Sequence, residues 1–549
     1  MSLLRRYSTK SVGFYITTPI YYVNAAPHIG HLYTSLIADA AFRWRSLKEQ
    51  AGLNKFVTGT DEHGSKIQKA AAKHSISVEK YCGEISNQYK LMSDTFSIAY
   101  TDFIRTTDEK HRTSVTSFWK TLEKNGFIYT SKYSGWYCVS DETFLTESQL
   151  KEVADHKGTK VIVSSETGHP VEWSEEENYM FALSKFQQPL IDWLTKGDQV
   201  KPKKFQKILC DVISKEELGD LSVSRPTSRV HWGIKVPDDD TQTVYVWLDA
   251  LVNYLTAANY PDVSSSVFKQ SWPPDCQVIG KDILKFHGIY WPAFLLAANL
   301  ELPKLLLCHS HWTVEDEKMS KSKNNVICPF NRNELYTNDG LRYFLLREGV
   351  AHSDGNYSDV KVTRILNSEL ADTLGNLLSR CCASALNPNQ VFPEIESEAF
   401  QSVASIDLTK KLIESAINLP DICDEHYSQF NFYKVADSTI ETLHIANQFF
   451  EYMKPWELKK KETSLDRLHV VLHITMETLR LCSIILQPII PNLSEQILNK
   501  LGVPKDKRRW SDLKYQSWND ADFHTRSLLR GKGVVFQRLM TNEKKAKRL

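Results

Sequence analysis

Two histidines near the N-terminus lie in the motif Pro27-His28-Ile29-Gly30-His31, between a β-branched, aromatic segment and a helical run. The N-terminus of a helix favours an anion, because its first backbone N–H groups and the helix dipole are positive there. The imidazoles of His28 and His31 can donate hydrogen bonds to phosphoryl oxygens, and Gly30 lets a flat ring approach the backbone. The motif predicts a triphosphate site, although two histidines beside a turn also occur on ordinary surfaces.

A basic segment, Lys318-Met319-Ser320-Lys321-Ser322-Lys323, lies far along the chain. Its lysines can neutralise the β- and γ-phosphates of a nucleotide, and its small polar residues allow a loop to close over them. A solvated lysine cluster is the alternative interpretation. The combination with the histidine motif favours the nucleotide.

The elements that must position these groups alternate between strands and helices. Residues 13–22 and 55–57 are rich in β-branched and aromatic residues, with a helical run over 32–44 between them. Strands predicted at 244–248 and 277–280 resume the pattern after a stretch of short strands and acidic clusters. Such alternation predicts a parallel sheet that binds ligands at the carboxyl ends of its strands.

The order of these segments predicts the domain organisation. We expect an α/β Rossmann-type nucleotide-binding catalytic domain with an inserted connecting domain, followed by an all-α helix bundle in which apolar residues recur at helical spacing. A polar segment over 387–405 is expected to be a loop between helices. The predicted boundaries are 12–125 and 244–310 for the halves of the catalytic domain, 126–243 for the insert, 311–367 for the region of the basic loop, 368–541 for the bundle, and 1–11 and 542–549 for basic terminal segments.

Composition excludes several classes of protein. The chain has 67 Lys+Arg against 66 Asp+Glu, so its net charge of +1 is not that of a strongly basic or acidic protein. Its ten cysteines include no C-x-x-C pair, as expected in a reducing compartment. The best apolar stretch, Trp291 to Leu300, is about half of the ~20 residues that a membrane span needs. No acid precedes Asp39, which is typical of an organelle transit peptide and also of an ordinary basic tail.

The two motifs, in this order, resemble the H-x-G-H and K-M-S-K-S signatures of the class I aminoacyl-tRNA synthetases. In that family an amino-acid carboxylate attacks the α-phosphate of ATP, and the aminoacyl group then passes to the 3′ end of tRNA. The resemblance implies that His28 and His31 stabilise the in-line transition state, and that Lys318 and Lys321 stabilise the departing pyrophosphate. The ATP contacts that it implies are His28, Gly30, His31, Gly280, Lys281, Asp282, Met319, Ser320, Lys321 and Ser322.

The segments 17–24, 59–64, 245–250 and 280–287 resemble those of methionyl-tRNA synthetases. Asp61 is expected in a loop after an apolar strand, where it can supply the countercharge that a buried ammonium requires. The resemblance implies that Asp61 binds the substrate ammonium and that apolar and aromatic residues line a side-chain pocket. A thioether is long, unbranched and polarisable, and aromatic walls give it favourable sulfur contacts. The implied methionine-binding residues are Ile20, Tyr22, Asp61, Trp247, Ala250, Leu251, Tyr254, Ile283 and His287. The residues implied to read the anticodon in the helix bundle are Asn376, Arg380, Pro455 and Trp456, and Pro455 and Trp456 are expected to end a helix.

The chain departs from that family in its zinc knuckle. The corresponding stretch, residues 137–142, carries the single thiol of Cys138, and one thiolate cannot form a tetrahedral site, so we expect no structural zinc and assign no metal ligand. The short chain after the bundle leads us to expect a monomer. The compact form and the basic start resemble the mitochondrial type of methionyl-tRNA synthetase, which implies a location in the mitochondrial matrix, no membrane contact, and L-methionine, ATP with Mg²⁺ and tRNA(Met) as partners.

Three alternatives were weighed against this prediction. Class I enzymes for branched aliphatic amino acids usually carry a large editing insertion, which residues 126–243 are too few to hold. A nucleotidyltransferase that shares the histidine turn does not need a helical domain from residue 368 onward. A non-catalytic tRNA-binding relative is disfavoured because His28, His31, Lys318, Lys321 and Asp61 are all intact.

Overall fold

The computed structural model divides the chain into two compact units. Unit 1 comprises Met1–Pro27, Ala51–Met92 and Tyr100–His309, and unit 2 comprises His28–Gln50, Ser93–Ala99 and Ser310–Leu549. The two terminal segments and residues Ser320, Lys321 and Ser322 lie outside the described part of the chain. The described residues are 13–48, 54–138, 143–145, 147–154, 160–165, 168–215, 217–319, 325–515, 527–529 and 534–540.

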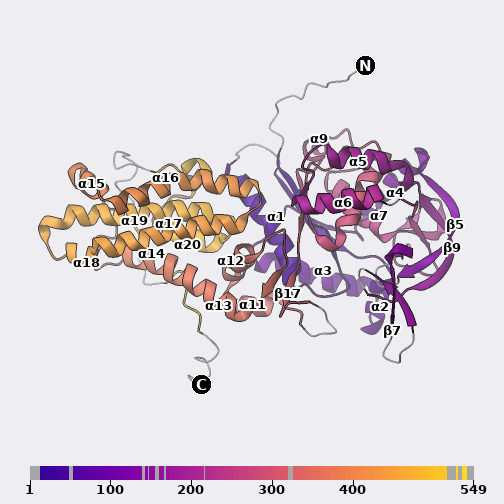
Figure 1. Ribbon diagram of the computed structural model, residues 1–549, viewed down its shortest axis with the longest axis horizontal. Helices are drawn as coiled ribbons and strands as arrows, with labels where there is room; N and C mark the ends of the chain where they lie inside the picture. The colour runs from indigo at the N-terminus through magenta and orange to yellow at the C-terminus, as the bar shows by residue number, and fades with distance from the viewer. Residues whose placement is uncertain are drawn as a thin grey trace, which may run out of the picture. The chain divides into compact units, whose positions relative to one another are not determined.

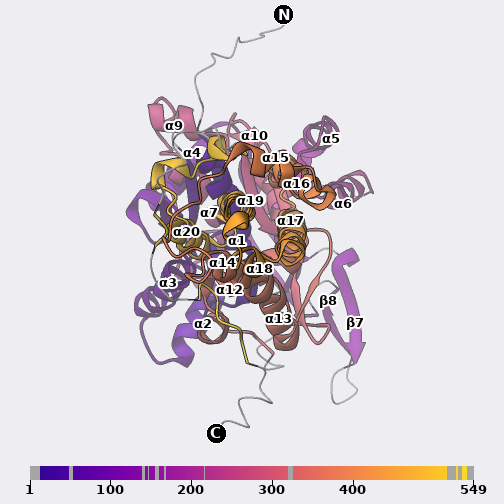
Figure 2. The ribbon, with the colours of Figure 1, turned by 90° about the vertical axis from the view of Figure 1, so that its left-hand side faces the viewer.

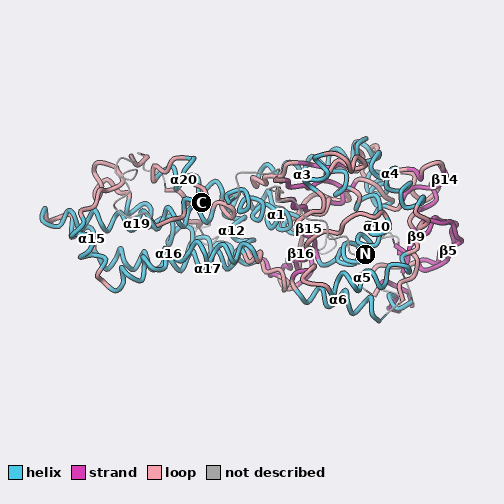
Figure 3. The backbone as a smooth tube through the Cα atoms, turned by 90° about the horizontal axis from the view of Figure 1, so that it is seen from above, coloured by secondary structure: helices cyan, strands magenta, loops and turns pink. Residues whose placement is uncertain are grey.

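Unit 1 contains a parallel sheet, of which two strands, β15 and β16, are labelled in Figure 3. It confirms the predicted class of fold, and all seven residues of strand β3 are buried, as expected when both faces of a sheet are covered. The order is β10-β16-β15-β1-β3-β2, with β4 also paired to β3. Its strands are β1 (Tyr15–Thr17), β2 (Tyr21–Tyr22), β3 (Lys55–Asp61), β4 (Asp102–Arg105), β10 (Val200–Lys201), β15 (Cys276–Gly280) and β16 (Leu306–His309).

The first predicted strand, at 13–22, is divided into β1 and β2, which pair with the start and the end of β3 respectively. Pro19 lies between them, and proline has no N–H to donate to a sheet ladder. Strand β3 is longer than the predicted 55–57 and ends at Asp61. The expectation that Asp61 lies in a loop after the strand was therefore wrong, because the polar residues before it continue the ladder.

The predicted strand at 244–248 was also wrong. Strand β14 (Asp239–Val244) ends where that run begins, and the residues after it form α7 (Val246–Leu251) and α8 (Asn253–Ala257). A short apolar run fits a buried helix as well as a strand, since both bury every side chain. Trp247 and Ala250 thus lie on a helix.

The middle of the chain contains strands, as predicted, but most of them pair antiparallel, two of them are long, and α5 and α6 lie among them. Strands β5 and β9 form a long ribbon, and β7 and β8 form a separate hairpin (Figure 2). Strand β10, within the range predicted for the insert, pairs with β16 of the parallel sheet. The bounds are β5 (Ile128–Cys138), β6 (Thr143–Leu145), β7 (Leu150–Ala154), β8 (Lys160–Ser164), β9 (Glu172–Phe181), α5 (Gln187–Thr195), α6 (Lys203–Lys215), β11 (Leu221–Ser222), β12 (Ser224–Pro226) and β13 (Lys235–Val236).

Unit 2 is mainly helical, and its long helices α16, α17 and α19 lie side by side (Figures 1 and 3). The segment predicted to be a loop at 387–405 contains α15 (Ser397–Ala404), whose first N–H groups donate to the Glu396 carboxylate. The other bounds are α1 (Ile29–Lys48), β17 (Trp312–Val314), β18 (Glu317–Lys318), α11 (Pro329–Tyr336), α12 (Asn338–Glu348), β19 (Gly355–Tyr357), α13 (Asp359–Ile365), η6 (Leu366–Gly375), α14 (Asn376–Cys381), α16 (Asp407–Ser428), α17 (Phe432–Met453), α18 (Pro455–Leu458), α19 (Leu465–Leu486) and α20 (Pro491–Lys500).

The segment Glu462–Leu486 is long and apolar enough to cross a membrane by length and composition. It is longer than the apolar stretch that the sequence offered at 291–300. Of its most apolar window, 94% is buried within the structure. Its two buried charges, Glu477 and Arg480, form an ion pair at 2.7 Å. These features are those of the central helix of a bundle.

Candidate active site

The carboxyl ends of neighbouring parallel strands bring predicted ligand-binding residues of unit 1 together. Tyr22 of β2 is in register with Asp61 of β3, so these two residues lie side by side, and Asp61 is largely buried. Gly280 ends β15, and Lys281 and Asp282 follow it in the short turn η3 (Lys281–Ile283). Ligands of open parallel sheets bind at this edge, where the strand order reverses.

Two residues predicted to bind methionine, Tyr254 and His287, form a buried pair. The Tyr254 hydroxyl and His287 Nε2 are 2.8 Å apart, and His287 Nδ1 lies 3.1 Å from the Ile283 carbonyl oxygen. Burial lowers the pKa of His287 to about 4, so its ring is neutral near pH 7. Since a carbonyl only accepts, Nδ1 carries the proton, and Nε2 accepts from the Tyr254 hydroxyl. The pair therefore has no net charge.

Trp247 of α7 stacks on Phe286 of helix η4 (Phe286–Tyr290), with ring centroids 3.6 Å apart. Phe286 is not among the predicted site residues, although it lies in the segment 280–287 and directly precedes His287. Ala250 and Leu251 are buried beside Trp247 on α7. Ile20 and Ile283 are partly exposed. This part of unit 1 thus supplies apolar and aromatic surface.

His28 and His31, in unit 2, form a compact stacked pair with centroids 3.8 Å apart at the start of α1. The backbone N–H of His28 donates to His31 Nδ1, and that of Gly30 donates to His28 Nδ1. Both Nδ1 atoms are therefore acceptors, and each neutral ring carries its proton on Nε2. The pair offers two imidazole N–H donors, as phosphoryl oxygens require.

The backbone donors at this turn are used within the chain. Ile29 N–H donates to the Ile327 carbonyl and Gly30 N–H to His28, so these two groups do not have the anion-binding role that the sequence suggested. Gly30 is needed for space, because a Cβ there would lie 2.8 Å from His28 Cε1 and 3.7 Å from Met319 Cε. The histidine motif and the two flanks of the basic loop therefore meet in unit 2.

Of the basic segment, Lys318 and Met319 lie within the described residues. The backbone of Lys318 ends β18, which pairs with β17. Met319 lies beside Gly30, as above. The predicted ATP contacts Ser320, Lys321 and Ser322 lie outside the described residues.

The residues predicted to read an anticodon lie on two elements of the helical bundle. The Arg380 guanidinium lies 5.6 Å from the Trp456 ring and 4.9 Å from the Phe450 ring, and it pairs with Glu451 at 2.6 Å. Trp456 is 37% exposed, so it is not a buried core residue. It follows Pro455 at the start of α18, whereas the sequence suggested that this pair ends a helix. Asn376, at the start of the helix that carries Arg380, is also exposed.

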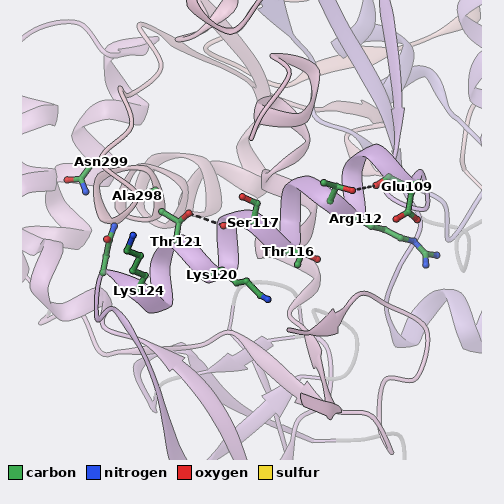
Figure 4. Close-up of a pocket in the computed structure, with 11 residues that line it drawn as sticks. Glu109, Arg112, Thr116, Ser117, Lys120, Thr121, Lys124, Ala298 and Asn299 are labelled. Carbon is green, nitrogen blue, oxygen red and sulfur yellow. Dashed lines mark hydrogen bonds between the residues drawn. The ribbon is translucent and has the colours of Figure 1, made fainter. Parts of the chain in front are cut away.

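A groove of about 760 Å³ in unit 1 lies elsewhere, along the outer face of α4 (Glu109–Lys124) (Figure 4). Its lining is polar and partly basic, with Arg112, Lys120 and Lys124 among its residues. None of the residues predicted to bind methionine or ATP lines it. The groove therefore does not mark the predicted site.

The family of the chain follows from comparison with known proteins. A family described as tRNA synthetases class I (M) matches residues 14–382, about two thirds of the chain. The chain belongs to the class I methionyl-tRNA synthetases. A second family, the anticodon-binding domain of tRNA ligase, matches residues 410–541.

Individual methionyl-tRNA synthetases match the chain almost from end to end. The chain is 44% identical over 544 residues to a protein of Takifugu rubripes named methionine–tRNA ligase, mitochondrial, covering 98% of this chain and 91% of that protein. It is 44% identical over 540 residues to the Homo sapiens protein of the same name, covering 96% and 90%. The Mycobacterium tuberculosis methionyl-tRNA synthetase, solved in complex with methionyl-adenylate, matches with a TM-score of 0.89 and 34% identity, covering 96% of this chain and all of the other.

Proposed function

We propose that the chain is an ATP-dependent methionine–tRNA ligase that charges tRNA(Met) in the mitochondrial matrix. The proteins that it resembles are named methionine–tRNA ligase and mitochondrial, and the mycobacterial relative was solved in complex with methionyl-adenylate. On this chain the proposal is supported by the contacts among the residues of unit 1 that are predicted to bind methionine. Tyr254 pairs there with a neutral His287, and Trp247 stacks on Phe286. Tyr22 and Asp61 lie side by side at the carboxyl ends of β2 and β3 in the same unit.

The stacked rings of Trp247 and Phe286, here called the aromatic wall, suit a thioether better than a branched or charged side chain. Aromatic faces and edges attract the polarisable sulfur of methionine, a contact that a branched aliphatic side chain cannot copy. A neutral His287 does not bring a charge that would require a counterion in the substrate. Asp61 supplies the carboxylate that the substrate ammonium needs at the other end. The proposed site thus binds the charged ammonium of methionine at one end and its apolar thioether at the other.

The first step joins the methionine carboxylate to ATP. A carboxylate oxygen attacks the α-phosphorus, the bond from that phosphorus to the bridging oxygen breaks, and pyrophosphate leaves with the electron pair. We assign to the Nε2–H groups of His28 and His31 the hydrogen bonds to phosphoryl oxygens, whose negative charge grows in the transition state. Lys318 and Lys321 neutralise the departing pyrophosphate. Mg²⁺ enters with ATP as part of the substrate.

The second step transfers the aminoacyl group to tRNA. A terminal ribose hydroxyl of the tRNA attacks the carbonyl carbon of the adenylate, AMP leaves, and the hydroxyl proton is released. We assign the reading of unpaired anticodon bases to Trp456, Arg380 and Asn376, because an exposed indole can stack on a base and the other two can donate hydrogen bonds to its edge. The enzyme is proposed to act as a monomer.

We further infer that the connecting region folds without zinc. The guanidinium of buried Arg225 lies 5.3 Å from the ring of Tyr137, 5.2 Å from that of Phe144 and 4.5 Å from that of Tyr245. This packing of a permanent cation among aromatic rings supplies side-chain contacts to the connecting region without a metal. Within the described ranges, no three His, Cys, Asp or Glu side chains are grouped as metal ligands. Zinc analysis of the purified protein by mass spectrometry tests the inference.

The activity is tested by amino-acid-dependent exchange of pyrophosphate into ATP, with each of the twenty amino acids. We expect exchange with methionine alone, and its collapse in Lys321→Ala. Charging of tRNA(Met) in a separate assay then tests the second step. Exchange with a different amino acid would mean that the pocket has been assigned wrongly. Binding of tRNA without any exchange would favour a non-catalytic protein.

A further inference from the structure

A buried carboxylate in unit 1 joins three elements around the predicted methionine pocket. Asp249 lies on α7 and is 1% exposed. Its Oδ2 is 2.6 Å from His63 Nδ1, and its Oδ1 is 2.8 Å from His111 Nε2. His111 belongs to α4, and His63 follows the end of β3. One carboxylate therefore ties the end of β3, α4 and α7 to one another.

The bonds at Asp249 are charge-assisted and enclosed. Burial by itself would raise the pKa of the Asp249 carboxyl, but the charge of His63 and the hydrogen bonds from both imidazoles outweigh burial and lower it to about 2. Asp249 is therefore ionised at physiological pH and can only accept. His111 Nδ1 meets the Thr256 hydroxyl of α8 at 3.0 Å, which extends the network to the helix that carries Tyr254.

The sequence positions of these residues connect the network to substrate binding. His63 is two residues after Asp61, the predicted partner of the substrate ammonium. Asp249 is two residues after Trp247, which forms part of the aromatic wall. The intervening Glu62 is itself held, because Arg105 donates to both of its carboxylate oxygens at 2.7 and 2.9 Å. The short turn after β3 is thus fixed from two sides, by Arg105 of β4 and by Asp249 of α7.

We propose that Asp249 is a positioning residue for methionine recognition, which through His63 fixes the Asp61 carboxylate relative to the Trp247 wall. This inference rests on the proposed function. Methionine must reach both ends of its site at once, with its ammonium at Asp61 and its thioether at the aromatic wall. A change in the separation of these ends weakens methionine binding, whereas the ATP contacts assigned to the chain include none of the network residues. Asp249 is accordingly expected to affect methionine rather than ATP.

The test compares the KM for methionine with the KM for ATP in pyrophosphate exchange. Asp249→Asn keeps the volume but replaces one acceptor oxygen by an NH₂ group that faces an imidazole donor. We expect its KM for methionine to rise about tenfold or more, and its KM for ATP to stay within about twofold. The matched control is Arg112→Gln, on the same α4 helix as His111 but exposed on the outer face that lines the groove (Figure 4). The control should leave both constants unchanged.

A second pair of variants separates positioning from simple packing. In His63→Asn the amide nitrogen takes the place of Nδ1 and can still donate to Asp249, whereas His63→Leu fills the space without a donor. We expect His63→Asn to stay within about threefold of the wild type in KM for methionine and His63→Leu to match Asp249→Asn. If Asp249→Asn does not fold, as judged by thermal melting, this pair decides the question.

Several results would overturn the proposal. They are an unchanged KM for methionine in Asp249→Asn, an equal rise in both KM values, or an equal loss in His63→Asn and His63→Leu. Exchange by the wild type with an amino acid other than methionine would refute the proposed function instead. The same variants would then be compared with that amino acid, so the role of Asp249 would still be decided.

Discussion

The neutral His287 makes a measurable prediction about acid. Its ordinary pKa of 6.5 is lowered to about 4 in the folded protein by burial. Between these values the unfolded chain binds a proton that the folded chain does not bind. Folded stability from this group is therefore fully present above the unfolded pKa and is lost as the pH falls from about 6.5 towards 4. Replacing His287 by Gln removes the titration but keeps an oxygen that can accept from the Tyr254 hydroxyl.

The size of the effect follows from the two pKa values. Lowering the pH from about 7 to about 5 nearly saturates the unfolded imidazole and leaves the folded one mostly neutral, which costs about 2 kcal/mol. The whole shift is worth about 3 kcal/mol once the pH is below 4. Asp249 does not interfere, because its pKa of about 2 against an ordinary 3.8 confines its contribution to more acid solution. Wild type should thus lose about 2 kcal/mol more than His287→Gln over this range.

Hydrogen–deuterium exchange of peptides that cover 286–297 is a suitable assay, because it reports the local opening of η4 and of α10 (Trp291–Ala297) without assuming two-state unfolding of the whole chain. Exchange rates are corrected for the intrinsic chemical rate at each pH. Hydrogen exchange in these peptides should accelerate towards pH 5 more in the wild type than in His287→Gln, whereas the methionine KM should stay nearly constant over this range because the folded ring remains mostly neutral. Equal pH slopes for the two proteins would show that His287 is not the titrating group and would refute the reasoning.

Three further predictions concern unit 2. Gly30→Ala should lower kcat of pyrophosphate exchange about tenfold or more, because the added methyl displaces the His28 ring; normal kcat would contradict the stacked geometry. Trp456→Ala should reduce kcat/KM for tRNA by about one to two orders of magnitude, the worth of stacking on a base, and spare exchange; equal losses in both assays would contradict it. Arg342→Met should break the 2.6 Å ion pair with the buried Asp39 carboxylate, which keeps the partly exposed Arg43 as a partner, and should remove the donor to the Phe96, Pro488 and Ile489 carbonyls. We expect a cost of about 3 kcal/mol of stability, measured as faster hydrogen exchange in α1.

The class of fold and the family could be predicted from the sequence, because both depend on patterns that are local. The histidine turn, the basic loop and the alternation of strands and helices are each visible within a few tens of residues. Patterns of this kind also predicted the parallel sheet and the helical bundle. The boundaries that failed are those where one local pattern fits two structures. The run at 244–248 is apolar enough for a buried helix, and α15 has a polar sequence that resembles a loop.

The hydrogen-bond roles of the site could not be predicted, because they depend on partners distant in sequence. The tautomers of His28 and His31 follow from backbone donors that are placed only once the chain is folded. Phe286 lies within the predicted segment, yet only its stacking on Trp247, 39 residues earlier, distinguishes it from a core residue. The bond from Ile29 to the Ile327 carbonyl likewise joins two motifs separated by most of the chain.

Two adjacent acids at the end of β3 show that the hydrogen-bond partners of a residue, and not its type alone, decide its role. Asp61 and Glu62 are equally plausible partners for an ammonium when only their types are known. Both oxygens of Glu62 accept from Arg105, and the Thr60 and Thr107 hydroxyls each donate to one of them at 2.7 Å. A carboxylate neutralised by a guanidinium attracts an incoming ammonium weakly, since the net field of the pair falls off quickly. Glu62 thus holds the turn, and this favours the proposal that Asp61, the residue indicated by the family resemblance, binds the substrate ammonium.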